Sequence, residues 1–188
     1  HWYLILCFTF IYRETGYFLH IIFPYEFDEL LINLDYQLLG IHPTLWLEKL
    51  INPWFTEIMH LSYASYWLMI PLSCGLFFMQ GKLNEFHKLL LGICIAFYIS
   101  FLMFIIFPAA GPRFVMASQH SLDLKGILLT DYFRTFINET GLRGGCFPSS
   151  HVAVAVVILK FFSAHQKRLS YFFFLWVTFL SMSTIYGL

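Results

Sequence analysis

The sequence predicts an all-α fold, a polytopic bundle of transmembrane helices with amphipathic helices at the membrane interface. Composition is the first reason, because 59% of the 188 residues are hydrophobic, 21% are aromatic and only 12% are charged. A soluble domain averages about 25% charged residues. The second reason is a mean hydropathy of +0.70, which comes from apolar runs that approach the roughly 20 residues needed by a spanning helix.

Five apolar runs are the predicted membrane spans. Residues 2–12 form a short run that ends at Arg13, and we interpret it as the end of a span that begins earlier. Four longer runs are predicted as spans: 58–79, 89–107, 147–164 and 170–188. Because His1 and Leu188 both lie in apolar runs, we expect a single membrane domain, 1–188, that is incomplete at both ends.

The stretch 14–57 separates the first two spans and is aromatic, mildly acidic and interrupted by prolines. Leucines recur in it near helical spacing, with acidic and amide side chains between them. This pattern is typical of short amphipathic helices lying at a membrane surface. A small extramembrane cap is the alternative. We therefore divide the domain into 1–57, a partial first span with interfacial helices, and 58–188, the main helical bundle.

The charges of the short loops predict the orientation in the membrane. Lys82 and Lys88 lie in the loop after the second span, and Lys167 and Arg168 lie in the loop before the last span. Two spans separate these loops, so both lie on one face, and the positive-inside rule makes that face cytoplasmic. The long loop 108–146, and the start of the helix that follows it, are then extracytoplasmic.

Charge balance and cysteine spacing restrict the partners and cofactors. Eleven Lys and Arg residues balance eleven Asp and Glu residues, so we expect no nucleic-acid partner. The four cysteines lack the spacing of a zinc site or a disulfide framework. No carboxylate cluster indicates a metal, and we therefore expect neither a metal nor another cofactor. Nothing in the sequence indicates an oligomeric state.

The most informative segment is a Gly-rich turn that runs into a helix start, residues 144–151, which read Gly-Gly-Cys-Phe-Pro-Ser-Ser-His. The first N–H groups of a helix have no partner within the helix, and the helix dipole makes that end positive. Such an end binds anions, above all phosphate. The alternative is that Ser149 acts only as an N-cap, which is a common way to begin a helix.

This segment resembles the second motif of the type 2 phosphatidic acid phosphatase superfamily. The membrane branch of that family includes lipid phosphate phosphatases and inositol phosphorylceramide synthases. The motif is usually Pro-Ser-Gly-His and often Pro-Ser-X-His in the synthase-like branch, and Pro148-Ser149-Ser150-His151 matches it. The resemblance implies a six-helix bundle, of which about five helices are present, and makes 58–188 a phosphatase-like bundle.

The other two family motifs are matched in part. The first is Lys, six residues, then Arg-Pro; Arg113 is its match, with Ile106 in place of the Lys and Phe114 in place of the Pro. The Gly-Pro-Arg sequence here is similar to the synthase-like branch. The third is Ser-Arg, five residues, His, three residues, Asp. Ser183, followed by Thr, is similar to its beginning, which implies a nucleophilic His two residues after Leu188.

The resemblance implies a phosphohistidine mechanism. The nucleophilic His of the third motif attacks phosphorus, and His151 protonates the leaving alkoxide as general acid. The phosphate oxygens are held by the Ser149 hydroxyl, by the amides of Ser150 and His151, and by Arg113. Arg143 is a further candidate because a guanidinium binds phosphate through two hydrogen bonds. An ordinary loop arginine is the alternative for Arg143.

Four polar residues at the start of the second span form a possible headgroup pocket: Glu57, His60, Tyr63 and Tyr66. Polar groups at membrane depth are costly and often functional. An aromatic belt at the membrane interface explains the two tyrosines equally well.

These observations predict a multi-pass integral membrane enzyme that removes or transfers a lipid-linked phosphate at the extracytoplasmic face, periplasmic or lumenal. A phospholipid or another lipid phosphate is the expected substrate. We expect the 188-residue piece itself to be inactive, because it stops before the expected nucleophile. One alternative is a non-catalytic, lipid-phosphate-binding polytopic membrane protein. Another is a structural membrane protein in which the Pro-Ser-Ser-His segment is only a helix cap.

Overall fold

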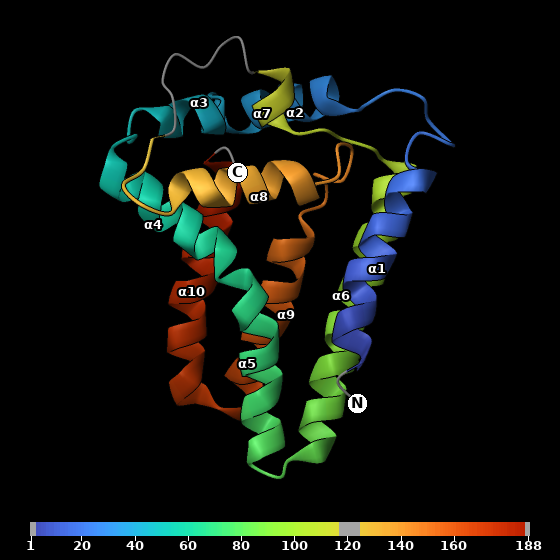
Figure 1. Cartoon of the computed structure of the whole chain (residues 1–188), viewed down its shortest axis with the longest axis vertical. Helices are drawn as coiled ribbons and strands as arrows, with labels where there is room; N and C mark the ends of the chain where they lie inside the picture. Colours follow the sequence, from blue (N-terminus) through green and yellow to red (C-terminus); the bar gives the residue numbers. More distant parts are fainter. Residues whose placement is uncertain (1–2, 117–124, 187–188) are drawn as a thin grey trace.

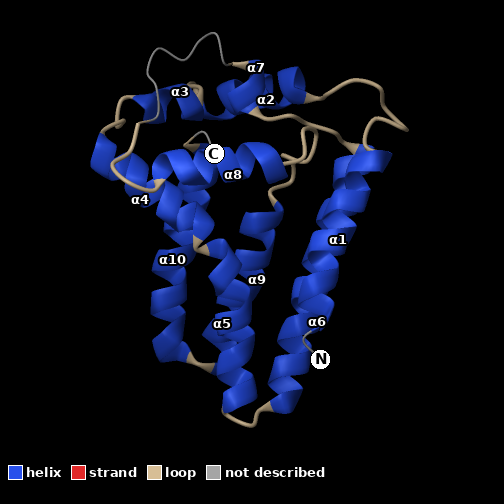
Figure 2. Ribbon diagram, in the orientation of Figure 1, coloured by secondary structure: helices blue, strands red, loops and turns tan. Residues whose placement is uncertain are grey.

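Helices form the secondary structure of the chain (Figures 1 and 2). The computed structural model describes residues 3–116 and 125–186, and these ranges contain no named strand. An isolated bridge pairs Ala109 with Gly145. The predicted all-α fold is therefore confirmed.

Two helices are long and apolar enough to cross a membrane, α6 (Leu83–Ile106, 24 residues) and α10 (Lys167–Ile185, 19 residues). A third span forms if α4 (Pro53–Ala64) and α5 (Tyr66–Met79) are taken together, since a bend of 47° joins them. The described helices thus provide two spans, or three with the bent pair, by length and composition.

The other two predicted spans correspond to helices that are too short to meet this criterion. α1 (Tyr3–Phe18) and α9 (Ser150–His165) have 16 residues each, fewer than the roughly 20 that a straight span requires. The structure therefore provides helices of spanning length for three of the five predicted spans, and the number of spans stays a prediction. α9 begins three residues later than predicted, since the residues before Ser150 belong to the loop and the cap.

The bend between α4 and α5 lies at Ser65 and is tied by side chains. The Ser65 hydroxyl donates a hydrogen bond to the Ser62 carbonyl, and Trp176 of α10 donates its ring N–H to the Ser65 hydroxyl. Serine hydroxyls that bond to the backbone compete with the helical ladder, and inserted side chains are a known cause of kinks. α4 begins earlier than predicted because Asn52 caps it, with Pro53 as the first helical residue.

The core lies between α6, α9 and α10, and α5 and α1 pack against it. Its largest buried side chains are phenylalanines, namely Phe77, Phe86, Phe104, Phe162 and Phe173. α6 and α9 approach closely at Gly92, where an added Cβ would lie 3.1 Å from Cγ1 of Val157. Small residues at helix crossings are typical of membrane proteins. This packing positions α9 and the loop that precedes it.

The two short cationic loops lie at one end of the bundle (Figure 1). The turn between α5 and α6 lies beside the turn between α9 and α10, since the Gln166 side-chain amide donates a hydrogen bond of 3.1 Å to the Gln80 side-chain oxygen. Lys82 and Lys167 therefore lie at the same end, as the sequence predicts. The side of the membrane that this end occupies stays a prediction.

Short helices cover the opposite end of the bundle (Figure 1): α2 (Asp28–Leu39), α3 (Pro43–Glu48), α7 (Pro112–Val115) and α8 (Thr130–Thr140). α2 and α3 confirm that the stretch 14–57 contains short helices. α8 lies in the segment 108–146, which was expected to be a long loop because it lacks an apolar run. These helices form a cap over the ends of α9 and α10.

The outer faces of the spanning helices are apolar. α6 exposes a row of aliphatic side chains at helical spacing, Leu91, Ile95, Ile99 and Leu102. α10 exposes a mainly aromatic set, Tyr171, Phe172, Phe174, Leu175 and Phe179. Apolar surface of this extent marks contact with a membrane or a partner, which agrees with an integral membrane protein.

Candidate active site

α9 begins with Ser149 as its N-cap, as the sequence predicts. The Ser149 backbone is extended, and its hydroxyl accepts a hydrogen bond of 3.4 Å from the Val152 amide. This bond is longer than the usual distance of about 2.7–3.2 Å, so it restrains the hydroxyl only weakly. Ser150 is buried and His151 is half-buried. The helix start therefore offers backbone N–H groups and a hydroxyl at the positive end of a helix, which are features of an anion site.

Two tyrosines pack against the imidazole of His151. Tyr63 of α4 stacks on it with ring centroids 4.7 Å apart and 26° between the ring planes. The ring of Tyr66 in α5 lies 4.2 Å from it, at 44°. The two tyrosines lie on either side of Ser65 at a spacing that puts both rings on one helix face, which is turned to the start of α9. These ring contacts restrict the orientation of His151 while leaving it partly exposed.

The loop that precedes α7 pairs with the loop that precedes α9. The Ala109 amide donates a hydrogen bond of 3.1 Å to the Gly144 carbonyl, and the Cys146 amide donates one of 3.0 Å to the Ala109 carbonyl. Gly111 has φ = +101°, and a Cβ there would lie 2.8 Å from Sγ of Cys146. Glycine adopts this conformation at little steric cost. The segments that match the first and second family motifs are therefore in direct contact.

Asp28, the first residue of α2, holds this loop pair from a third element. Its carboxylate accepts hydrogen bonds from the amides of Ala110 at 2.8 Å and Gly111 at 2.7 Å, and the residue is 4% exposed. The neighbouring Phe27 amide donates a hydrogen bond of 2.9 Å to the Pro108 carbonyl. This role could not be predicted from the sequence, because Asp28 has the pattern of an ordinary polar residue on an amphipathic helix. Its hydrogen-bond partners lie far along the chain.

Arg113 follows this restrained segment directly, as the second residue of α7. The hydrogen bonds of residues 109–111 hold the chain before Arg113 against the loop that leads to Ser149. The side chain of Arg113 lies outside the described part of the chain, so its contact with phosphate stays a prediction.

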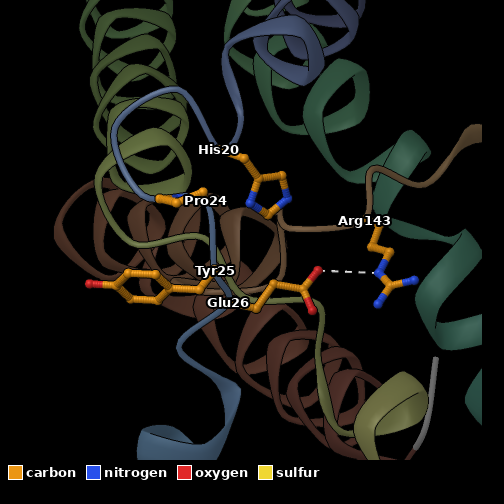
Figure 3. Close-up of a pocket in the computed structure, with 5 residues that line it drawn as sticks. All are labelled: His20, Pro24, Tyr25, Glu26 and Arg143. Atoms are coloured by element: carbon orange, nitrogen blue, oxygen red, sulfur yellow. Dashed lines mark hydrogen bonds and ion pairs between the residues drawn. The ribbon is translucent and has the colours of Figure 1, made fainter.

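Arg143 contacts a different group from the predicted phosphate site. Its Nε donates a hydrogen bond of 3.2 Å to Oε1 of Glu26, and its guanidinium lies 5.9 Å from the ring centroid of Phe114. None of its contacts among the described residues involves Ser149. Figure 3 shows Arg143 and Glu26 at a hollow of about 380 Å³, which is also lined by His20, Pro24 and Tyr25.

The four residues of the predicted headgroup pocket fall into two groups. Tyr63 and Tyr66 contact His151, as described above. Glu57 and His60 lie further towards the start of α4 and bind backbone groups. The structure therefore brings only the two tyrosines to the candidate site.

Glu57 anchors the segment before α8. Its carboxylate accepts hydrogen bonds of 2.7–3.3 Å from the amides of residues 127–129 and one of 2.8 Å from the Thr130 hydroxyl. His60 is 1% exposed, and its Nδ1 lies 2.9 Å from the carbonyl oxygen of Thr56. Hydrogen bonds to an ionised carboxylate are stronger than neutral ones. The four bonds to Glu57 therefore hold the segment before α8, and with it the cap, against α4.

The end of α10 lies at the same end of the bundle as the start of α9 (Figure 1). Ser183, which begins the match to the third motif, is buried. The hydroxyl of Tyr186 lies 2.8 Å from Oγ1 of Thr56 in α4 and ties the end of α10 in place. The segments that match the three motifs therefore lie at one end of the molecule.

Metal-ligating side chains do not gather in the described part of the chain, where no group of three His, Cys, Asp or Glu residues is placed to hold an ion. The four cysteines, all of which lie in the described part of the chain, form no disulfide with one another.

A match to a protein-family model identifies the superfamily of this chain. The sequence model of the PAP2 superfamily matches residues 29–187, from the first turn of α2 to beyond the end of α10. The chain belongs to the PAP2 superfamily. Members of this superfamily are phosphatases with a helical fold, so membership supports a phosphatase-type enzyme acting on a phosphorylated substrate. No curated protein and no solved structure gives a significant match to the chain.

Proposed function

We propose that this PAP2-superfamily protein removes or transfers a lipid-linked phosphate at the end of the bundle where α9 begins. One observation carries the proposal: the loop that leads to Arg113 is hydrogen-bonded to the loop that leads to Ser149 and His151. This pairing holds two segments that are distant in sequence against each other. In the proposal they supply a cation, Arg113, and a helix N-terminus, which together bind a phosphoryl group.

The start of α9 holds the phosphoryl group in this proposal. The amides of Ser150 and His151 and the hydroxyl of Ser149 donate hydrogen bonds to its oxygens, and Arg113 neutralises charge that develops in the transition state. The Ser149 hydroxyl is available for this because its present bond to Val152 is long. Arg143 provides a second cation nearby when its side chain leaves Glu26.

His151 acts as the general acid. A histidine of the third motif attacks phosphorus and forms a P–N bond while the P–O bond to the lipid breaks, and His151 gives its proton to the leaving oxygen. Water or an alcohol then attacks the phosphohistidine, passes its proton to His151 and frees the nucleophile. The resemblance to the family puts that nucleophile two residues after Leu188.

The acceptor of the phosphoryl group and the membrane face of the site are proposed from the sequence. The Gly-Pro-Arg segment favours the inositol phosphorylceramide synthase-like branch, in which an alcohol rather than water accepts the phosphoryl group. The loop charges favour an extracytoplasmic site. A phospholipid in the outer leaflet is then the substrate, and hydrolysis and transfer differ only in the acceptor.

The test is His151→Ala in the complete protein, purified in detergent. Turnover is measured with a short-chain phosphatidic acid, and with phosphatidylinositol plus a ceramide acceptor. A positioned general acid contributes about 10²–10⁴-fold, so turnover should fall by that factor while the thermal unfolding midpoint stays close to that of the wild type. His165→Ala, at the other end of α9, is the matched control and should keep its activity.

Near-normal turnover by folded His151→Ala protein would overturn the catalytic assignment. A wild-type protein that binds vanadate without turning over either substrate would instead favour the non-catalytic lipid-phosphate binder.

A further inference from the structure

The hydroxyl of Tyr66 is a buried polar group without a hydrogen-bond partner among the described residues. Tyr66 is 4% exposed and lies at the start of α5, directly after the bend at Ser65. Buried hydroxyls are nearly always bonded in native proteins, and an unpaired one needs an explanation such as a catalytic role or a bound group. Stability alone does not explain a tyrosine here, because phenylalanine would supply the same ring without an unpaired polar atom.

The location of Tyr66 supplies the explanation. The Tyr66 ring packs directly against the residue proposed as general acid, with its centroid 4.2 Å from that of His151. A general acid works only within hydrogen-bond reach of the oxygen that it protonates. A substrate bound to His151 therefore brings its oxygens beside the Tyr66 side chain.

Hydrogen bonds at the bend between α4 and α5 restrain the segment that carries Tyr66. Trp176 of α10 donates its ring N–H to the Ser65 hydroxyl, which itself donates to the carbonyl of Ser62. Tyr63 and Tyr66 lie on either side of Ser65 and both contact the one imidazole, as residues at this spacing share one helix face. These bonds therefore tie the two tyrosines to the bundle beside His151.

We propose that the Tyr66 hydroxyl donates a hydrogen bond to an oxygen of the phosphorylated lipid beside His151, and is a catalytic residue of the site. This inference rests on the proposed function, since it needs a phosphate substrate at His151. The bond forms only when substrate is bound, so the unbound protein carries the cost of the unpaired hydroxyl. In this proposal the Tyr66 hydroxyl lowers the stability of the unbound protein and raises its enzymatic activity.

The test is Tyr66→Phe in the complete protein, which removes only the hydroxyl. Turnover of short-chain phosphatidic acid should fall about three- to tenfold in kcat/KM, the range expected for losing one neutral hydrogen bond. The thermal unfolding midpoint should be equal to or higher than that of the wild type. Tyr98→Phe, an exposed tyrosine on α6, is the control and should change neither quantity.

A Tyr66→Phe protein with wild-type kcat/KM would overturn the inference. A fall in activity explained entirely by a smaller folded fraction would also overturn it, because the hydroxyl would then be structural. Comparison with His151→Ala distinguishes failure of the Tyr66 inference from failure of the proposed function. If His151→Ala is inactive and Tyr66→Phe is fully active, only the role of Tyr66 fails, whereas an active His151→Ala protein refutes the proposed function itself.

Discussion

The carboxylate of Asp28 accepts a hydrogen bond of 2.7 Å from the backbone amide of Gly111, which lies 83 residues later in the chain. The bond joins the first turn of α2 to the N-cap residue of α7. Because the same loop also bonds to the chain before α9, Asp28 influences how the two candidate phosphate-binding segments sit relative to one another. A residue of the cap therefore supports the geometry of the site.

Asp28→Asn should lower both stability and turnover. The carboxylate accepts two backbone hydrogen bonds, and an amide group in its place turns one acceptor into a donor that faces an N–H group. Leaving a buried donor unpaired costs about 1–3 kcal/mol. Displacement of the loop before Arg113 by about an ångström should reduce turnover up to about 10²-fold. Thermal unfolding in detergent and kcat/KM for phosphatidic acid measure the two effects.

The control for Asp28 is Asp35→Asn, an exposed acid on the same helix. It makes the same change of charge and should leave stability and turnover close to those of the wild type. Equal effects of the two substitutions would show that the charge of α2, and not the bonds to residues 110 and 111, matters.

Gly111→Ala should disrupt the contact between the two motif loops. Its φ of +101° disfavours any side chain, and the new Cβ would lie 2.8 Å from Sγ of Cys146. Gly81→Ala is the matched control, because Gly81 also has a positive φ of +71° but has no atom within 4 Å of the added Cβ. The control should lose about 1–2 kcal/mol of stability and keep its turnover, whereas Gly111→Ala should lose turnover as well.

A second substitution tests whether the clash between the new Cβ at position 111 and Sγ of Cys146 causes the loss of turnover. Adding Cys146→Ala to Gly111→Ala removes the sulfur that the new Cβ meets, so part of the lost turnover should return. If the double variant is no more active than Gly111→Ala, the contact with Cys146 is not the cause.

Glu57→Gln should loosen the cap over the bundle. The carboxylate accepts bonds from three backbone amides and the Thr130 hydroxyl, and an amide side chain cannot accept them all. Amide hydrogen exchange at residues 127–129 should become faster, while Glu139→Gln, an exposed residue of α8, should leave it unchanged. A higher KM for lipid with unchanged exchange would contradict the anchoring role and favour a headgroup contact for Glu57.

The sequence predicted those features of the fold and site that depend on local pattern. The helix cap at Ser149 follows from a serine placed before an apolar run, and the position of the two cationic turns at one end of the bundle follows from counting spans. The apolar runs predicted the positions of α6 and α10, because a long uninterrupted run of apolar residues is typical of a membrane-spanning helix and of few other structures.

Features that depend on contacts distant in sequence could not be predicted. The bonds of Asp28 to the loop before α7 and of Glu57 to the loop before α8 link segments whose proximity only the packed bundle creates. The bend at Ser65 was also missed, because a serine in an apolar helix often bonds to its own backbone without breaking the helix. The Ser65 hydroxyl at the bend also accepts a hydrogen bond from Trp176, a residue of another helix. Local patterns therefore named His151 and the two tyrosines as separate candidates, but could not predict that their rings are in contact.

The orientation of the bundle in the membrane is the last prediction. The α5–α6 and α9–α10 turns, which carry Lys82 and Lys167, lie at the end of the bundle opposite to α8 (Figure 1), and short cationic loops stay on the cytoplasmic side. In a variant without the four native cysteines, Lys125→Cys should react with a membrane-impermeant maleimide on intact cells.

Lys82→Cys is the control from the other end and should react only after the membrane is permeabilised. Both residues are exposed, so a difference in labelling reports the side of the membrane and not burial. Labelling of Lys82→Cys alone on intact cells would reverse the orientation. The start of α9 would then face the cytoplasm, and its substrate would come from the inner leaflet.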